Sequence, residues 1–108
     1  MNNDTLETLT FYDLWIEYSN YKKVKLKPQS FRKINNNFIN HILPYFKDYL
    51  VKDINSKIYL DWMGKINDET YTFAFKSSLH YCINNILNYA MKIYGLNENI
   101  ATKIGTFN

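Results

Sequence analysis

The sequence is poor in residues that cross-link or break a chain. It holds one cysteine, Cys82, with three glycines and two prolines in 108 residues. A single cysteine excludes an internal disulfide and a thiolate metal cage, so we interpret Cys82 as a buried, unreactive thiol in a reducing compartment. The scarcity of glycine and proline leaves too few turns for a many-stranded sandwich and favours an all-helical fold.

Long apolar runs are also missing. None approaches the ~18 residues that cross a bilayer, and the start Met-Asn-Asn-Asp lacks the basic and apolar parts of a signal peptide. We therefore expect a cytoplasmic protein without a membrane partner. With 46% hydrophobic residues, the chain has enough apolar material for one core, and its length fits one domain.

Positive charge is concentrated in one third of the chain. Residues 1–17 contain four carboxylates and no Lys or Arg, and residues 48–108 are balanced. Residues 18–47 contain no carboxylate but seven bases: Lys22, Lys23, Lys25, Lys27, Arg32, Lys33 and Lys47. Such a segment can attract a polyanion although the formal net charge is only +3.

Apolar spacing predicts two helices in the first half of the chain. The first runs from about 10 to 21, with Thr10 as its N-cap. Lys27 and Pro28 interrupt it, because Pro restricts the residue before it and suits a helix start. The second helix then runs to Leu43 and is expected to stop at Pro44, followed by a packed connection.

Two more helices are expected in the second half. The third begins at Asn55 or Ser56 and ends near Ile66; the fourth begins near Thr70 or Thr72 and ends before Gly95. We therefore predict an all-α, compact four-helix bundle over residues 10–97. Residues 1–9 are expected to be an N-terminal extension and residues 98–108 a linker.

No catalytic or metal site can be assembled from the sequence. His80 and Cys82 are two residues apart, which turns them about 200° from each other on a helix, so they cannot share a metal. We interpret His80 as a polar-face residue, and His41 either as a cation at a helix C-terminus or as a phosphate contact. We expect no cofactor, no metal and no enzyme activity from these 108 residues alone.

Two helix faces without carboxylates are the main functional signal. One lies on the second helix and the other on the fourth, where no acid stands between Thr70 and Asn97. Lys and Arg neutralise phosphates, while Asn and Arg can contact base edges, so such faces suit DNA. The alternatives are an ordinary solvated face, an anionic membrane surface, or a protein-interaction module that uses exposed Tyr12, Tyr45 or Tyr71.

The order of several short motifs resembles the core-binding, SAM-like domain of phage integrases, which are tyrosine recombinases. The similarity spans about residues 9–101, and Ile100 departs from it because the family usually has Pro there. The motifs are Thr10-Phe11-Tyr12-Asp13-Leu14-Trp15, Leu26-Lys27-Pro28-Gln29-Ser30-Phe31, Asn40-His41-Ile42-Leu43-Pro44-Tyr45-Phe46, Leu50-Val51-Lys52-Asp53-Ile54-Asn55, and Ile86-Leu87-Asn88-Tyr89-Ala90-Met91 with Leu96, Asn97 and Asn99.

The resemblance implies one half of a C-shaped clamp that holds double-stranded DNA at the core attachment site. In this family the catalytic residues belong to a separate domain, to which residues 98–108 would lead. The whole protein would be a site-specific recombinase for DNA integration and excision. It would work through a transient phosphotyrosine link without metal, in an assembly with other protomers. It would act at the nucleoid of a bacterial host.

The resemblance also implies which residues face DNA. We expect Lys and Ser to contact phosphates, and Arg32, Asn36 and Asn37 to read bases. The candidates are Lys25, Lys27, Gln29, Ser30, Arg32, Lys33, Asn36, Asn37, Thr72, Lys76, Ser77, His80 and Asn84.

Overall fold

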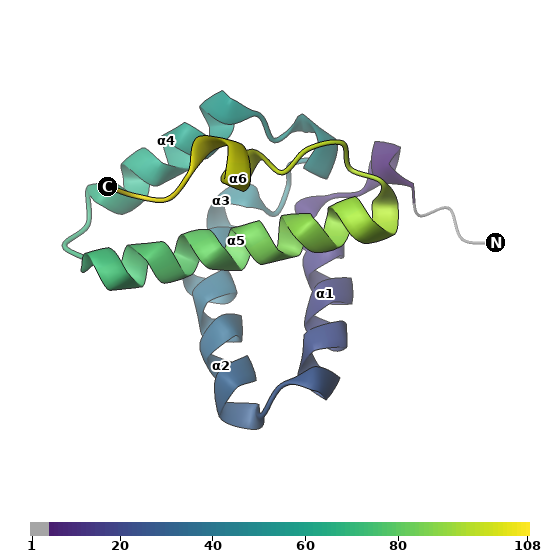
Figure 1. Cartoon of the computed structure of the whole chain (residues 1–108), viewed down its shortest axis with the longest axis horizontal. Coiled ribbons are helices and arrows are strands. Elements are labelled where there is room, and N and C mark those ends of the chain that lie inside the picture. The colour runs from purple at the N-terminus through teal and green to yellow at the C-terminus, as the bar shows by residue number, and fades with distance from the viewer. Residues whose placement is uncertain (1–4) are drawn as a thin grey trace.

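The computed structural model describes residues 5–108, and helices account for most of them (Figure 1). Among these residues, four helices have ten or more residues, as the sequence predicts. The elements in chain order are η1 (Leu6–Thr8), α1 (Phe11–Lys25), α2 (Pro28–Asn37), the π-helical turn η2 (Phe38–Ile42), α3 (Leu43–Phe46), η3 (Val51–Asp53), α4 (Ser56–Asn67), α5 (Phe73–Tyr94) and α6 (Ile100–Ile104). The prediction of an all-α fold is confirmed.

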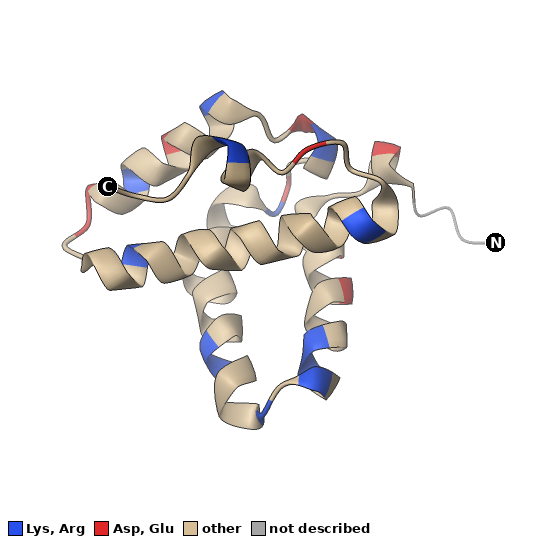
Figure 2. Ribbon diagram, in the orientation of Figure 1, with Lys and Arg blue, Asp and Glu red and all other residues tan. Residues whose placement is uncertain are grey.

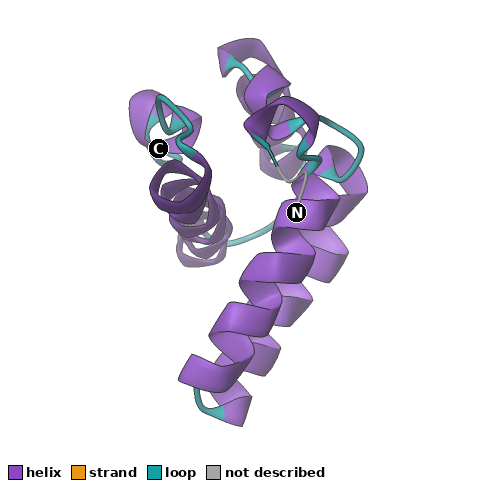
Figure 3. Ribbon diagram, turned by 90° about the vertical axis from the view of Figure 1, so that its right-hand side faces the viewer, coloured by secondary structure: helices purple, strands orange, loops and turns teal. Residues whose placement is uncertain are grey.

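The helices are arranged around α5. Helices α1 and α2 form a hairpin whose tip projects from the rest of the molecule, and α5 crosses both of its arms (Figure 1). Helices α4 and α6 contact each other, and α6 also packs on α5 (Figure 3). The hairpin and the α4–α6 pair therefore cover different sides of α5. None of the described helices is long and apolar enough to span a membrane.

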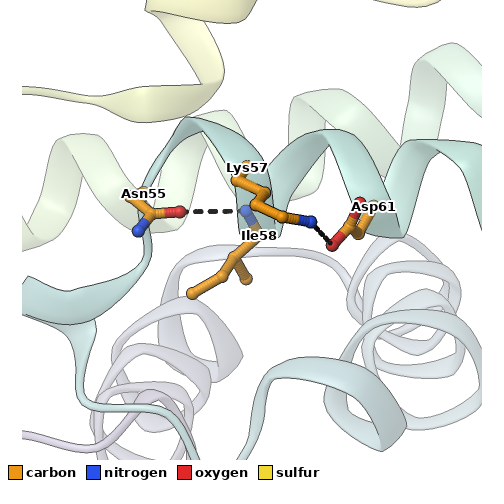
Figure 4. Close-up of polar contacts among 4 residues, drawn as sticks. All are labelled: Asn55, Lys57, Ile58 and Asp61. Atoms are coloured by element: carbon orange, nitrogen blue, oxygen red, sulfur yellow. Dashed lines mark hydrogen bonds and ion pairs between the residues drawn. The ribbon is translucent and has the colours of Figure 1, made fainter.

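Side-chain caps fix where the helices begin. The side chains of Thr10 and Thr72 accept hydrogen bonds from the backbone N–H groups three residues on, and Asn55 does the same for Ile58 at 3.0 Å (Figure 4). These bonds satisfy N–H groups that have no partner within the helix. At the other end of α5, Gly95 adopts a φ of 76°, which a residue without a Cβ tolerates.

Pro44 does not end the second helix, so that prediction is wrong. The chain passes through the π-helical turn Phe38–Ile42 and continues as α3. Pro44 has no N–H for the ordinary bond to the carbonyl of residue 40, and the N–H of Leu43 instead reaches the carbonyl of Phe38. The widened turn leaves the His41 carbonyl to accept a hydrogen bond from the Trp62 indole N–H at 3.0 Å.

An aromatic core joins the hairpin to the rest of the fold. The rings of Trp15 and Phe38 stack with centroids 4.2 Å apart, and Phe11 lies 5.5 Å from Phe46. These four side chains are all buried. Because they come from α1, η2 and α3, burying them fixes how the two arms of the hairpin lie against each other.

The segment before α1 is also part of the fold. Leu9 is buried, and its carbonyl accepts a hydrogen bond from the N–H of Val51 at 2.8 Å. The prediction of an N-terminal extension over residues 1–9 is therefore wrong for Leu9 itself, while residues 1–4 lie outside the described part of the chain. With the N–H groups of Phe11 and Tyr12, which donate to the carbonyls of Tyr49 and Lys47, three backbone hydrogen bonds tie residues 9–12 to the connection after α3.

The expected linker over residues 98–108 is likewise part of the fold. Its first turn is capped by Asn99, whose side chain accepts from the N–H groups of Ala101 and Thr102. The amide of Asn99 donates to the backbone carbonyl of Asn84 at 3.0 Å and to Oδ1 of Asn88 at 2.9 Å. Further along, Phe107 is only 2% exposed and its ring lies 5.9 Å from that of Trp62. A five-residue helix is too short to show a period, so the sequence pattern missed it.

Candidate nucleic-acid interface

The tip of the α1–α2 hairpin is basic and open to solvent. Figure 2 shows Lys and Arg, but no Asp or Glu, on the part of the hairpin farthest from α5. Seven of the residues predicted to face DNA lie on this hairpin with exposed side chains: Lys25, Lys27, Gln29, Ser30, Arg32, Lys33 and Asn36. The structure therefore brings the hairpin part of the predicted set together.

A groove runs between this hairpin and α5. It consists of two adjoining pockets of about 330 and 250 Å³, which share Tyr18 and Asn85. We call it the α1–α2–α5 groove. Its lining residues are Tyr18, Tyr21 and Lys22 of α1; Lys33, Ile34, Asn37 and Phe38 of α2 and η2; and Ser78, Tyr81, Cys82, Asn85, Asn88, Tyr89, Lys92 and Ile93 of α5.

The charge in the groove is of one sign. Lys22, Lys33 and Lys92 line it, and none of its lining residues within the described chain is Asp or Glu. No groove lysine belongs to an ion pair found among residues 5–108. Lys25 adds a fourth cation at the side, since its Nζ lies 5.0 Å from the centroid of the Tyr21 ring. The groove therefore offers four unpaired positive charges to an anionic partner.

The carboxylate of Glu17 on α1 is held by tyrosine hydroxyls. Tyr89 donates a hydrogen bond to it at 2.6 Å, and Tyr94 donates another. Glu17 lines a separate pocket with Asp13 rather than the groove. Burial, together with the hydrogen bond to Glu17, raises the pKa of Tyr89 to about 12, so this hydroxyl keeps its proton at neutral pH. The two tyrosines thus fix the negative charge outside the groove.

Two predicted DNA contacts are buried and bonded to other side chains of the fold. His80 is only 4% exposed, and its Nδ1 lies 2.6 Å from the Tyr59 hydroxyl. Burial lowers the pKa of His80 and so favours the neutral ring. Asn37 is also buried, and its amide donates to Sγ of Cys82 at 3.7 Å. The expectations of a polar-face His80 and a base-reading Asn37 are therefore corrected.

The other predicted residues of α5 are occupied within the fold. Thr72 caps the helix, and Lys76 donates to Oδ1 of Asn67 at 3.0 Å. Ser77 accepts a hydrogen bond from Thr106, and Asn84 accepts one from Thr102. Because the C-terminal segment lies on this stripe of α5, the polar side chains there hold that segment in place.

The free polar stripe of α5 lies on the neighbouring face and was not among the predicted contacts. It carries Ser78, Tyr81, Asn85, Asn88 and Lys92, which recur every three or four residues and line the groove. Tyr81 on this stripe is 57% exposed, which only the structure shows. Lys22 on α1 was missed for a similar reason, since only the packing of α5 makes it part of a groove.

Metal binding finds no support in the structure. Within residues 5–108, no three His, Cys, Asp or Glu side chains come together as ligands. Cys82 lies on the floor of the groove, and burial is the main cause that raises the pKa of its thiol. A raised pKa keeps the thiol protonated and disfavours both metal binding and nucleophilic attack.

Comparisons with known proteins identify the family and the fold. Residues 10–67 match the family described as phage integrase, N-terminal SAM-like domain. Among solved structures, the solution NMR structure of an integrase-like domain from Bacillus cereus superposes with a TM-score of 0.86 at 16% identity, covering 94% of this chain and 86% of that one. No protein with a curated description matches the sequence. The SAM-like fold prediction is thereby confirmed.

Proposed function

Because the chain belongs to the family of phage integrase N-terminal SAM-like domains, we propose that it binds double-stranded DNA through the α1–α2–α5 groove and the basic hairpin tip. The observation that carries this proposal is the set of four cations, Lys22, Lys25, Lys33 and Lys92, on a surface whose lining residues include no carboxylate among those described. Lysines of this kind neutralise phosphates and release counterions.

The polar side chains divide into two roles. Ser78, Asn85 and Asn88 stand beside the groove lysines, where they can hydrogen-bond to phosphate or sugar oxygens. Arg32 and Asn36 are exposed on α2 outside the groove and are the candidates for contacts to base edges. Phosphate contacts in the groove would set the position of the domain on the DNA. Contacts from α2 to base edges would give the domain its preference for a DNA sequence.

In the longer protein, this domain would form one arm of a clamp on the core attachment site. The chemistry of a site-specific tyrosine recombinase would belong to a separate catalytic domain and to neighbouring protomers. This role places the protein with bacterial DNA in the cytoplasm, where it takes part in DNA integration and excision. The domain itself would need no cofactor, because binding requires only the side chains named above.

A protein-interaction module is less well supported. Of the three tyrosines considered for that role, Tyr45 packs on Phe46 and Tyr71 packs on Phe75, and both are half-buried. Only Tyr12 is exposed. One exposed tyrosine does not make an apolar patch of the size that interaction sites use.

The salt dependence of duplex binding tests the proposal. With four phosphates neutralised, log K should fall against log salt with a slope of about −3.6, because each contact contributes about −0.9. Fluorescence anisotropy with a labelled 20-bp duplex between 50 and 300 mM salt measures this slope. A slope between zero and −1, or no binding at 50 mM salt, would reject the groove as a phosphate-binding surface.

A further inference from the structure

The groove contains an aromatic platform that phosphate binding leaves unexplained. Where the end of α1 meets the C-terminal half of α5, the ring of Tyr89 lies 5.4 Å from Tyr18 and 5.3 Å from Tyr21. Tyr18 is buried beneath the pocket, whereas Tyr21 is 40% exposed. Two packed rings thus support a third, half-open ring, and the Nζ atoms of Lys25 and Lys22 lie 5.0 and 6.0 Å from its centroid.

Polar and cationic groups surround this platform. Lys22 and Lys92 line the same pocket of about 330 Å³, and so do the amides of Asn85 and Asn88. The hydroxyl of Tyr89 is already committed to Glu17, so the ring of Tyr89, not its polar end, belongs to the pocket. This volume lies within the range of pockets that hold small ligands.

A stacked duplex cannot use an aromatic platform of this kind. Its outer surface offers phosphates and sugars, while the faces of its bases are covered by their neighbours. An unpaired base has a free π-face for a tyrosine ring, edges for amide hydrogen bonds, and a phosphate for a lysine. The pocket combines partners for all three groups in Tyr21, Asn85 or Asn88, and Lys22 or Lys92.

We propose that the Tyr21 pocket receives an unpaired, extrahelical nucleotide of a DNA duplex that lies along the groove. This inference rests on the proposed function, because the duplex on either side of the unpaired base would be held by the groove lysines. The base would stack on Tyr21, and Lys22 and Lys92 would meet the phosphates that flank it.

The test compares two bulged duplexes that differ only in one base. One 20-bp duplex carries a single unpaired thymine at its centre, and the other carries an abasic site at the same position, so their backbones have the same length and charge. Anisotropy titrations should give about tenfold tighter binding of the thymine bulge, since stacking of one base on an aromatic ring is worth about that factor. Tyr21→Ala should reduce the ratio to about one.

Tyr12→Ala is the matched control. Tyr12 is an exposed tyrosine nine residues before Tyr21, which places it on the opposite side of α1, and its removal should leave the ratio unchanged. As a readout that needs no variant, 5-iodouracil in the bulge should crosslink the wild-type chain at Tyr21 under ultraviolet light.

The outcomes separate this inference from the proposed function. A wild-type ratio near one, or a crosslink that maps outside the pocket, would overturn the unpaired-nucleotide site even if the intact duplex binds normally. If the bulged duplex binds and the intact duplex does not, the site is supported and the groove proposal fails. If neither duplex binds, both are wrong.

Discussion

Replacing Lys22, Lys33 and Lys92 together with glutamine is expected to weaken duplex binding about 500-fold at 0.1 M salt. At that salt concentration each lost phosphate contact lowers log K by about 0.9, so three lost contacts lower the affinity about 500-fold. All three residues line the groove, and none of them makes an ion pair found in the described chain. Stability should therefore change little, and anisotropy titration measures the loss directly.

The chain offers a control with the same change in net charge. Lys52, Lys57 and Lys103 pair with Asp53, Asp61 and Glu98, respectively, outside the groove. The Lys57–Asp61 pair stands on the exposed side of α4 at 3.0 Å (Figure 4). Replacing these three lysines with glutamine should change duplex affinity less than about tenfold, since only the long-range field is altered. Equal losses in the two triple variants would mean that net charge, and not the groove, governs binding.

Phe107→Ala is expected to destabilise the domain by about 3–5 kcal/mol, the usual cost of emptying a buried Phe site. Phe107 is 2% exposed and packs on Trp62, and the Nζ of Lys76 lies 5.8 Å from its ring centroid. For a domain of this size, the melting temperature should fall by about 12–20 °C. Thermal unfolding followed by circular dichroism measures this shift.

Phe73→Ala provides the matched control for that prediction. Phe73 opens α5 with 54% of its surface exposed, so its truncation removes few contacts and should lower the melting temperature by no more than about 4 °C. If Phe107→Ala were as mild as Phe73→Ala, the C-terminal segment would not be docked on α4 and α5. The expectation of a free linker would then be correct.

Local sequence signals predicted the helices well because each signal acts over a few residues. Thr10, Asn55 and Thr72 cap the helices that the apolar spacing indicated, and Gly95 ends α5. The prediction that the helix ends at Pro44 failed because a proline near the start of a helical turn is tolerated when the preceding turn widens. Whether a turn can widen depends on partners such as the Trp62 indole, which come from elsewhere in the chain.

The sequence alone predicts the hairpin side of the candidate site but not the α5 side. The basic hairpin follows from charge counting, because its lysines are neighbours in the sequence. On α5, however, the sequence shows two polar stripes, one through Ser77 and Asn84 and one through Ser78 and Asn85. Residues 99–107 pack on the first stripe and cover it. The sequence pattern of that short segment does not predict this packing. The groove therefore appears only once α5, the hairpin and the C-terminal segment are placed together.

A titration of the ¹⁵N-labelled domain with a 20-bp duplex shows which stripe of α5 contacts the DNA. The backbone amide signals of Lys33, Tyr81 and Asn85 should move as duplex is added, while those of Ala101 and Thr102 on α6 should stay in place. If only the signals of α6 and of the stripe of α5 beneath it moved, and the groove amides did not, DNA would not bind in the α1–α2–α5 groove.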